Sequence, residues 1–304
     1  MAQEQFIHIS KFGRLANQML QLMFAHELKR RIGRDILITG YDIPEFGLSG
    51  PERPEDGDIG AQIVIAQHIT NLDQVALAMR QRLVRSVNVN TLGMRLEYYR
   101  DRGQCIALFP DPDIPFYRPA SDELVMHVRA GDTLEKVHYT YMPMPLSWYR
   151  AVVAEQPELR PVFVGEYHGT PLETLLREEF PEATLRPAAS AIADFQTLRH
   201  AHHVSMSVGT FGWLATWLSL TAKTIHMPVA GLLMPMISTT LLTPVDDSRY
   251  RFYQTPYPRD KAEKEALDMF EWIATAGPVE RMPLQKVALL ARKALFDRPN
   301  APAS

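Results

Sequence analysis

The hydrophobic residues of this chain follow two alternating patterns. Short apolar, β-branched runs such as ELVMHV at 123–128 and PVFVG at 161–165 predict buried strands. Between such runs, segments like TPLETLLREEF at 170–180 place apolar residues three and four positions apart, which is typical of an amphipathic helix. Alternation of strands and helices predicts parallel strands joined by right-handed crossovers, so the expected fold class is α/β with doubly wound sheets.

The predicted elements fall into two groups on either side of a proline-rich stretch. DPDIPFYRPAS at 111–121 has no periodicity, and we expect the chain to cross there between two lobes. In the first lobe we expect a helix from about Asn17 to Arg31 and a last strand at QCIALF, 104–109. The expected organisation is an N-terminal lobe at 1–120, a second lobe at 121–245, and C-terminal helices at 246–304 that pack back across both lobes.

Composition and charge narrow the classes of function. The chain has 304 residues and a formal net charge of −3, so no basic field is available to hold a nucleic-acid backbone. Cys105 is the single cysteine, which excludes an internal disulfide and favours a reducing compartment. The N-terminal residues lack a basic segment followed by an apolar one, so we expect no signal peptide and a cytoplasmic protein.

One uncharged stretch, MPVAGLLMPMISTTLLTPV at 227–245, approaches the length of a membrane span. Pro228, Pro235 and Pro244 would break a helix there, so a span is not expected. Two alternatives stay open for this stretch: a peripheral membrane contact, or a loop packed over the second lobe.

The first candidate binding loop is FGRLANQ at 12–18. Gly13 lets the backbone turn sharply, and Ala16 is small enough for a close approach. The helix that follows presents free N–H groups and the positive end of its dipole, which suits a phosphate. An ordinary turn between a strand and a helix is the alternative.

The second candidate loop is HVRAGDT at 127–133, directly after the apolar strand ELVM. Arg129 can direct two hydrogen bonds onto a diphosphate and stabilise the charge of a departing nucleoside diphosphate. Asp132 is a candidate for orienting an acceptor hydroxyl or taking its proton, and Glu135 is a second candidate base. The alternative is a structural ion pair between Arg129 and Asp132.

The third candidate loop is SVGTFGWLATWLS at 207–219, where a turn of small residues leads into a helix. Ser207, Thr210 and the N–H groups near Gly209 and Phe211 would form a second anion site at a helix N-terminus. Trp213 and Trp217 lie one helical turn apart in that helix, and we expect them to pack in the core.

Taken in order, these segments resemble the fucosyltransferase superfamily that includes bacterial α1,2-fucosyltransferases, α1,6-fucosyltransferases and protein O-fucosyltransferases. FGRLANQMLQLMFAHEL is similar to the family's G-x-x-x-N-Q segment and its helix, and HVRAGDT is similar to its H-x-R-R-G-D-type motif. DFQTLRHAHHVSMSVGTFGWLATWL resembles the stretch in which an aspartate precedes a Ser/Thr-Phe-x-Trp turn. The resemblance covers about residues 6–30 and 120–220.

The resemblance implies a GT-B-like architecture, with two Rossmann-like lobes of mostly parallel sheets and a ligand cleft between them. It implies GDP-fucose as donor, a glycan or lipid-linked hydroxyl as acceptor, inversion at the anomeric carbon, and no metal or other cofactor. Arg129 would contact the β-phosphate and assist departure of the leaving group. The other positions implied at the donor are His127 and Asp194 toward the guanosine, Thr210 and Phe211 against the phosphates or base, and Gly13, Arg14 and Asn17 along the cleft.

The sequence also departs from the family pattern at three positions. Ala130 stands where the family has a second arginine, Ala16 replaces the second glycine of the loop, and Gly212 replaces the family's serine before the tryptophan. Loss of the second arginine favours an alternative in which the chain is an inactive nucleotide-binding module.

Two metal hypotheses are the remaining alternatives. Asp111 and Asp113 follow CIALF, which we expect to be a strand, and paired carboxylates there would suit a metal-dependent GT-A transferase. The cluster His200, His202 and His203 has poor ligand geometry, because adjacent residues on regular structure point apart. We therefore expect no metal site at the histidines, and the sequence makes no prediction of oligomeric state.

Overall fold

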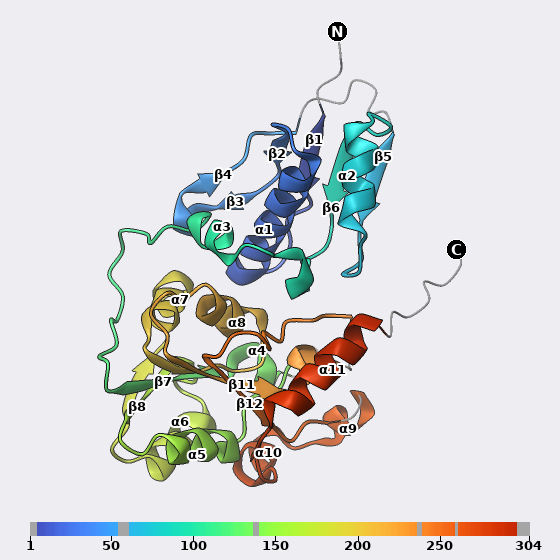
Figure 1. Ribbon diagram of the computed structural model, residues 1–304. Coiled ribbons are helices and arrows are strands. Elements are labelled where there is room, and N and C mark those ends of the chain that lie inside the picture. Colours follow the sequence, from blue (N-terminus) through green and yellow to red (C-terminus); the bar gives the residue numbers. More distant parts are fainter. Residues whose placement is uncertain (1–4, 54–60, 136–139, 236–238, 259–260, 297–304) are drawn as a thin grey trace. The chain divides into compact units, whose positions relative to one another are not determined.

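The computed structural model describes residues 5–53, 61–135, 140–235, 239–258 and 261–296 (Figure 1). By its internal contacts the chain divides into two compact units, Met1–Asp113 and Ile114–Ser304, which we call unit 1 and unit 2. The division falls inside the proline-rich stretch at 111–121. Residues 246–304, which we expected to form a separate segment across both lobes, belong to unit 2.

Unit 1 contains a four-stranded parallel sheet in the order β2-β1-β6-β5. Its elements are β1 (Phe6–Ile9), α1 (Leu15–Ile32), β2 (Leu37–Thr39), β3 (Asp42–Ile43), η1 (Pro44–Phe46), β4 (Leu48–Ser49), β5 (Gln62–Ile65), α2 (Leu72–Arg80), β6 (Ser86–Val89), η2 (Leu96–Tyr98) and α3 (Arg102–Ala107). Strands β3 and β4 pair separately as an antiparallel hairpin. Helix α1 ends at Gly33, whose φ of 73° is the left-handed conformation that glycine adopts readily.

The prediction of a strand at 104–109 is wrong, because this segment forms most of α3 and the turn that follows it. The side chain of Asp101 caps the helix by accepting a hydrogen bond from the N–H of Gln104 at 3.2 Å. Cys105 and Phe109, four residues apart, are both buried, and this is a helical spacing. The strand that lies beside β1 inside the sheet is instead β6, where Val87 and Val89 alternate with polar residues.

Unit 2 is built on a seven-stranded sheet. Its elements are β7 (Glu123–Arg129), α4 (Gly131–Leu134), α5 (Leu146–Glu155), β8 (Arg160–Glu166), α6 (Pro171–Glu179), β9 (Thr184–Pro187), α7 (Ala191–His200), β10 (His203–Ser205), α8 (Thr210–Trp217), β11 (Thr224–Val229), η3 (Gly231–Leu233), β12 (Tyr250–Gln254), α9 (Lys261–Ala266), α10 (Met269–Thr275), β13 (Glu280–Arg281) and α11 (Leu284–Phe296). Strand β12 was not foreseen in the sequence after residue 245.

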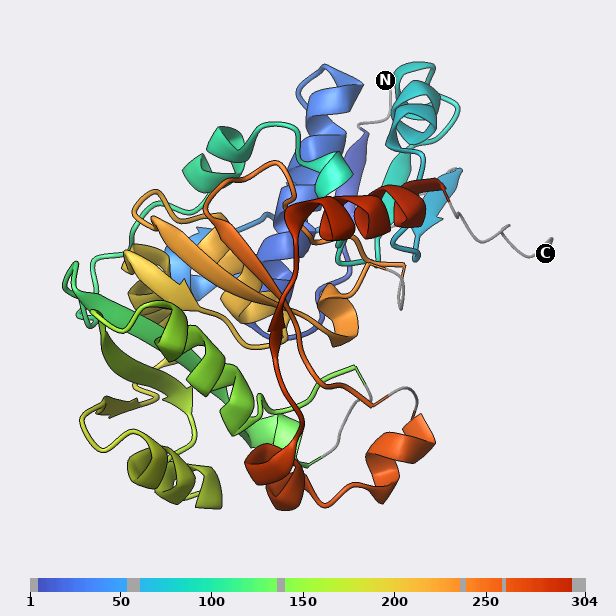
Figure 2. The same ribbon diagram turned by 60° about the horizontal axis from the view of Figure 1, so that its bottom comes forward.

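The strand order of unit 2 is β13-β12-β11-β10-β7-β8-β9, and every neighbouring pair is parallel except β12 with β13. Figure 2 shows these strands side by side, with the orange β11 and β12 next to each other. Helices α5 and α6 cover one face of the sheet, and α7 and α8 cover the other (Figure 1). The expected α/β class, with two Rossmann-like units on mostly parallel sheets, is therefore confirmed.

Most described residues of the uncharged stretch at 227–245 are buried in unit 2, whereas Thr239 is exposed. Residues 227–229 complete β11, and the side chains of Leu233 and Leu242 are buried. Met236, Ile237 and Ser238 lie outside the described residues. No helix in the described part of the chain is long and apolar enough to cross a membrane.

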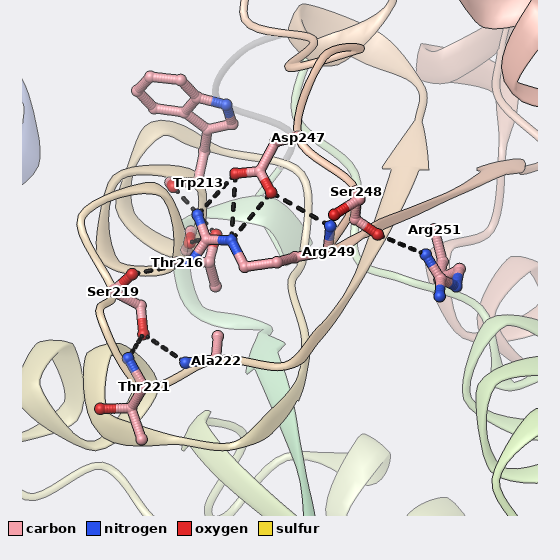
Figure 3. Close-up of polar contacts among 10 residues, drawn as sticks. Trp213, Thr216, Ser219, Thr221, Ala222, Asp247, Ser248, Arg249 and Arg251 are labelled. Carbon is pink, nitrogen blue, oxygen red and sulfur yellow. Dashed lines mark hydrogen bonds and ion pairs between the residues drawn. The ribbon is translucent and has the colours of Figure 1, made fainter. Parts of the chain in front are cut away.

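Helix α8 is held at its C-terminal end by a polar cluster from the segment before β12. The guanidinium of Arg249 donates to the carbonyl of Ser219 at 2.7 Å and forms an ion pair with Asp247 at 2.6 Å (Figure 3). A positive charge near the last carbonyls also suits the helix dipole. Trp213 and Trp217 stack on each other inside the core, as expected, and Trp213 donates to the carbonyl of Leu242.

We expect Arg249→Ala to lower the free energy of unfolding by about 1–3 kcal/mol, because it removes charged hydrogen bonds that are mostly shielded from water. Arg251→Ala is the matched control, since Arg251 bonds only to backbone carbonyls of nearby residues among the hydrogen bonds in the described structure. Urea unfolding followed by tryptophan fluorescence measures both. Equal effects of the two variants would contradict a specific role for Arg249 at the end of α8.

Candidate functional site

The topology of unit 2 marks one place where a ligand would bind. From β7 the chain proceeds to β8 and β9 on one side, and then returns to β10 on the other side of β7. The strand order therefore reverses between β7 and β10. In open parallel sheets, ligands bind in the crevice outside the carboxyl ends of the strands at such a reversal. The residues at this reversal follow Val128 and Ser205. They belong to the second and third candidate loops of the sequence.

Arg129 is the last residue of β7 and lies at this reversal. Its Nε and Nη2 donate to the two carboxylate oxygens of Asp132, at 3.0 and 2.7 Å. The ring of Tyr141 lies against the guanidinium, 4.6 Å from Cζ. The ion pair with Asp132, which the sequence left as an alternative role, is thus present.

The loop after β10 approaches the same guanidinium. Nη1 of Arg129 lies 3.5 Å from the carbonyl oxygen of Val208. Gly209 has a φ of 153°, and a Cβ added to it would lie 2.5 Å from Nη1, so only glycine lets the loop pass this close. A guanidinium carries five N–H donors. Three are engaged with described residues, and five minus three leaves two for a ligand.

His127 and Ser207 lie behind this surface rather than on it. His127 is 5% exposed and Ser207 is 1% exposed, and the Ser207 hydroxyl lies 2.8 Å from Nδ1 of the imidazole. Burial, with a contribution from the nearby charge of Arg129, lowers the pKa of His127 to about 3, so the ring is neutral at pH 7. Both residues were expected to contact a donor molecule. In this structure their side chains bond to each other and support the loop.

The residues at the start of α8 include one aromatic ring that is partly accessible. Phe211 lies 5.6 Å from His127 and 5.5 Å from Phe195, measured between ring centroids. Thr210 begins the helix and is buried. The N-terminal end of α8 therefore lies beside Arg129, with the ring of Phe211 in its first turn. The contact of Thr210 and Phe211 with a donor stays a prediction.

Asp194 lies in the first turn of α7, on the same side of the sheet as α8. Its carboxylate accepts a hydrogen bond from the N–H of Ala189 at 3.3 Å and is 8% exposed. Burial raises the pKa of Asp194 to about 6, and the charge of Glu166 adds to this effect against the Ala189 hydrogen bond. A desolvated carboxyl with a raised pKa is a common feature of binding and catalytic sites.

Two residues at this edge were not found from the sequence. Glu166 ends β8 in register with Arg129, and a Cβ on Gly131 would lie 2.7 Å from its Oε2. It follows the strand PVFVG, so the rule that parallel strands end at one edge would have found it. Tyr141 follows a stretch without periodicity, and no sequence signal places its ring against Arg129.

The first candidate loop belongs to unit 1. Gly13 has a φ of 78°, and a Cβ there would lie 2.4 Å from the side-chain Nδ2 of Asn17. Arg14 is exposed at the N-cap of α1, and the carbonyl of Gly13 accepts a hydrogen bond from Gln18 at 2.9 Å. Gly13, Arg14 and Asn17 thus share one turn at the carboxyl end of β1. Their proposed role at a donor stays a prediction.

The other carboxylates named from the sequence lie elsewhere. Asp111 and Asp113 are exposed, and the element before them is the helix α3 rather than a strand. A metal-dependent GT-A site was suggested by a strand that leads into a carboxylate pair. The described structure of unit 1 has no such strand before Asp111 and Asp113. Glu135 is exposed at the end of α4.

Comparison with known proteins gives similarity at the level of structure only. No protein-family model matches the chain, and no curated protein matches its sequence. A mutant of Arabidopsis thaliana FUT1 in complex with GDP is 11% identical, with a TM-score of 0.45 over 85% of this chain and 72% of that chain. A glycosyl transferase family 9 protein from Veillonella parvula is 9% identical, with a TM-score of 0.47 over 98% and 99%. At these values activity has to be inferred from the chain's own residues.

We expect Gly212→Ala to destabilise unit 2 by about 1–3 kcal/mol, although alanine normally favours a helix over glycine. The added Cβ would lie 2.8 Å from Nδ1 of His127 and 3.3 Å from Cβ of Met206. Urea unfolding measures the change. Gly277→Ala is the control, with an expected effect within about 0.5 kcal/mol, because no atom lies within 4 Å of its added Cβ. A stabilising Gly212→Ala would mean that His127 does not pack against α8.

Proposed function

We propose that this chain is a glycosyltransferase that binds a nucleoside-diphosphate sugar in unit 2 and transfers the sugar to a glycan or lipid-linked hydroxyl. The donor that we propose is GDP-fucose, and the reaction inverts the anomeric centre without a metal ion. The motif order at residues 12–18, 127–133 and 207–219 supports this choice of donor.

One observation carries the proposal. The guanidinium of Arg129 lies at the reversal point of a doubly wound sheet, beside Gly209 and the first turn of α8. Two of its N–H donors remain for an anion, and the N-terminal end of a helix adds backbone N–H groups and a positive dipole. This combination suits a diphosphate better than a neutral ligand.

The proposed step has a simple balance. The oxygen of the acceptor hydroxyl attacks the anomeric carbon of the donor sugar, and the bond from that carbon to the β-phosphate oxygen breaks. GDP leaves with the electron pair of that bond, and the hydroxyl proton passes to a base. Arg129 stabilises the negative charge that develops on the β-phosphate, which lowers the barrier if the charge is greater in the transition state than in the donor.

The role of Asp132 in this scheme is to position Arg129. Both of its carboxylate oxygens accept hydrogen bonds from the guanidinium, and a carboxylate held in this way is a poor proton acceptor. Glu166 and Glu135 are further carboxylates in the same region of unit 2. A transition state dominated by departure of GDP would need only a weak base.

Asp194 supports a guanine nucleotide over an adenine one. Guanine presents two neighbouring N–H donors on its Watson–Crick edge, and a carboxylate can accept from both. Asp194 is desolvated and keeps a raised pKa, so it would gain hydrogen bonds from such an edge. The direct test is a thermal-shift panel of GDP-, UDP- and ADP-linked sugars, with and without a chelator, because a bound donor stabilises the folded state. Selective stabilisation by GDP-fucose in the presence of chelator supports the proposal, and no stabilisation by any donor would contradict it.

A nucleotide-binding module without activity is a second candidate, favoured by Ala130. This residue is fully buried at the N-cap of α4, and its N–H donates to the carbonyl of Glu166 at 2.7 Å. The position of the family's second arginine thus holds no charge. Tight GDP binding without donor hydrolysis or transfer to any of a panel of glycans would favour this candidate.

We expect Arg129→Ala to lower kcat/KM for transfer by about 100-fold or more, which corresponds to ~3 kcal/mol in the barrier. Arg150→Ala is the matched control, because Arg150 also forms a two-bond pair with a carboxylate, that of Glu179, on α5 and α6. The control should keep normal turnover. Near-normal turnover of Arg129→Ala would remove the proposed mechanism.

We expect GDP to bind more tightly as the pH rises through about 6, because only the ionised carboxylate of Asp194 accepts two hydrogen bonds. Asp194→Asn should weaken binding about tenfold at pH 7.5 and remove this pH dependence. Calorimetric titration from pH 5 to 8 measures both effects, with the exposed Asp122→Asn as control.

Ionisation of Asp194 lowers the free energy of unfolding, whereas it strengthens the expected binding of GDP. A carboxyl with a raised pKa in the folded state contributes stability below about pH 4, and this contribution is lost as the pH rises through about 6. Asp194→Asn should therefore be more stable than the wild type at pH 7 while binding GDP less well. A variant that loses stability and keeps its affinity would make Asp194 a structural residue.

A further inference from the structure

Lys264 is the only lysine that is buried in the described part of the chain. It lies on α9 and is 2% exposed. Removing an ammonium group from water is costly unless it is well paired. Its Nζ donates to the backbone carbonyl of Tyr141 at 2.5 Å, across 123 residues of sequence. Tyr141 is the residue whose ring lies against Arg129.

The segment that carries this carbonyl is also held from a second side. A Cβ added to Gly231 would lie 2.4 Å from the carbonyl oxygen of Thr140 and 2.5 Å from the hydroxyl of Tyr257. Gly231 has a φ of 51°, which an L residue with a side chain adopts only with strain. Thr140 itself is buried. The backbone at 140–141 is therefore fixed between η3 and α9.

Fixing this backbone also fixes the aromatic ring. Cζ of Arg129 lies over the ring of Tyr141, 4.6 Å from its centroid. Asp132 holds the same group in its plane through two hydrogen bonds. A carboxylate pair alone allows the guanidinium and carboxylate to tilt together, whereas an aromatic ring packed beneath Cζ restricts that movement.

We propose that Lys264 is a positioning residue for the anion site: by holding Tyr141 it sets the orientation of the Arg129 guanidinium. The inference rests on the proposed function, because it assumes that Arg129 binds a diphosphate. It assigns a role in the donor site to α9, a helix that no motif of the sequence connects with that site. With Ala130 in place of a second cation, a single guanidinium carries the side-chain charge beside Gly209, so its orientation has a large effect on affinity.

The experiment measures GDP binding by calorimetry at 25 °C in the full chain, together with the melting temperature of each variant. Lys264→Met removes the charge and keeps the length of the side chain, and we expect about a tenfold rise in Kd. Lys264→Arg keeps a donor and should restore most of the affinity. Lys261→Met is the matched control on the same helix, because Lys261 is exposed and pairs with Glu265. The control should bind GDP like the wild type.

A double-mutant cycle separates positioning from a general loss of stability. Tyr141→Leu removes the ring and should also raise Kd about tenfold, whereas Tyr141→Phe keeps the ring and should leave Kd unchanged. If Lys264 acts through Tyr141, adding Lys264→Met to Tyr141→Leu changes Kd little further. Multiplicative effects of the two changes overturn the proposal.

The remaining outcomes are also distinct. A lower melting temperature of Lys264→Met with an unchanged Kd makes Lys264 structural and overturns the inference alone. If Lys264→Met does not fold, Tyr141→Leu decides: unchanged GDP affinity overturns the inference, and a weakened affinity that Tyr141→Phe restores supports it. A wild type that does not bind GDP overturns the proposed function and the inference together.

Discussion

The close approach of Gly209 to Arg129 is the constraint on which the rest of unit 2 depends. Gly209 follows β10 and Arg129 ends β7, and these strands become neighbours only because the chain crosses back after β9. The crossing requires α7 and α8 to lie on the face opposite α5 and α6. It also requires α8 to keep its direction, and the contacts of Trp213 and Arg249 hold that helix at two points along its length. The proposed anion site is thus a consequence of how the whole sheet is ordered.

Much of this architecture could be predicted from the sequence, since the second unit alternates strands and helices with strong periodicity. The error at 104–109 arose where periodicity is least informative. Five apolar residues in a row suit a buried strand or a short helix equally, and only the cap at Asp101 decides. Strand β12 was missed because Tyr250–Gln254 is short, because the adjacent Phe252 and Tyr253 break the alternation of apolar and polar residues, and because the segment follows a long loop.

The residues of the candidate site also divide into those that could be predicted from the sequence and those that could not. Residues at or just after the ends of buried strands, such as Arg129 and Gly209, could be predicted as site residues because parallel strands end at one edge of the sheet. The direction in which each side chain points could not, and Ser207 and His127 face inward because a hydroxyl and an imidazole can bond to each other in a dry interior. Lys264 and Tyr141 are 123 residues apart in the sequence, and no local sequence pattern indicates their contact.

The neutrality of His127 connects packing with electrostatics. A protonated imidazole behind Arg129 would add a second charge to a water-poor region, and burial together with the guanidinium prevents this by lowering the pKa of His127 to about 3. Gly212 makes the arrangement possible, because any larger residue there would meet the imidazole ring. Beside Gly209, the proposed site then offers one guanidinium and one helix N-terminus to an anion, with a neutral histidine packed behind them.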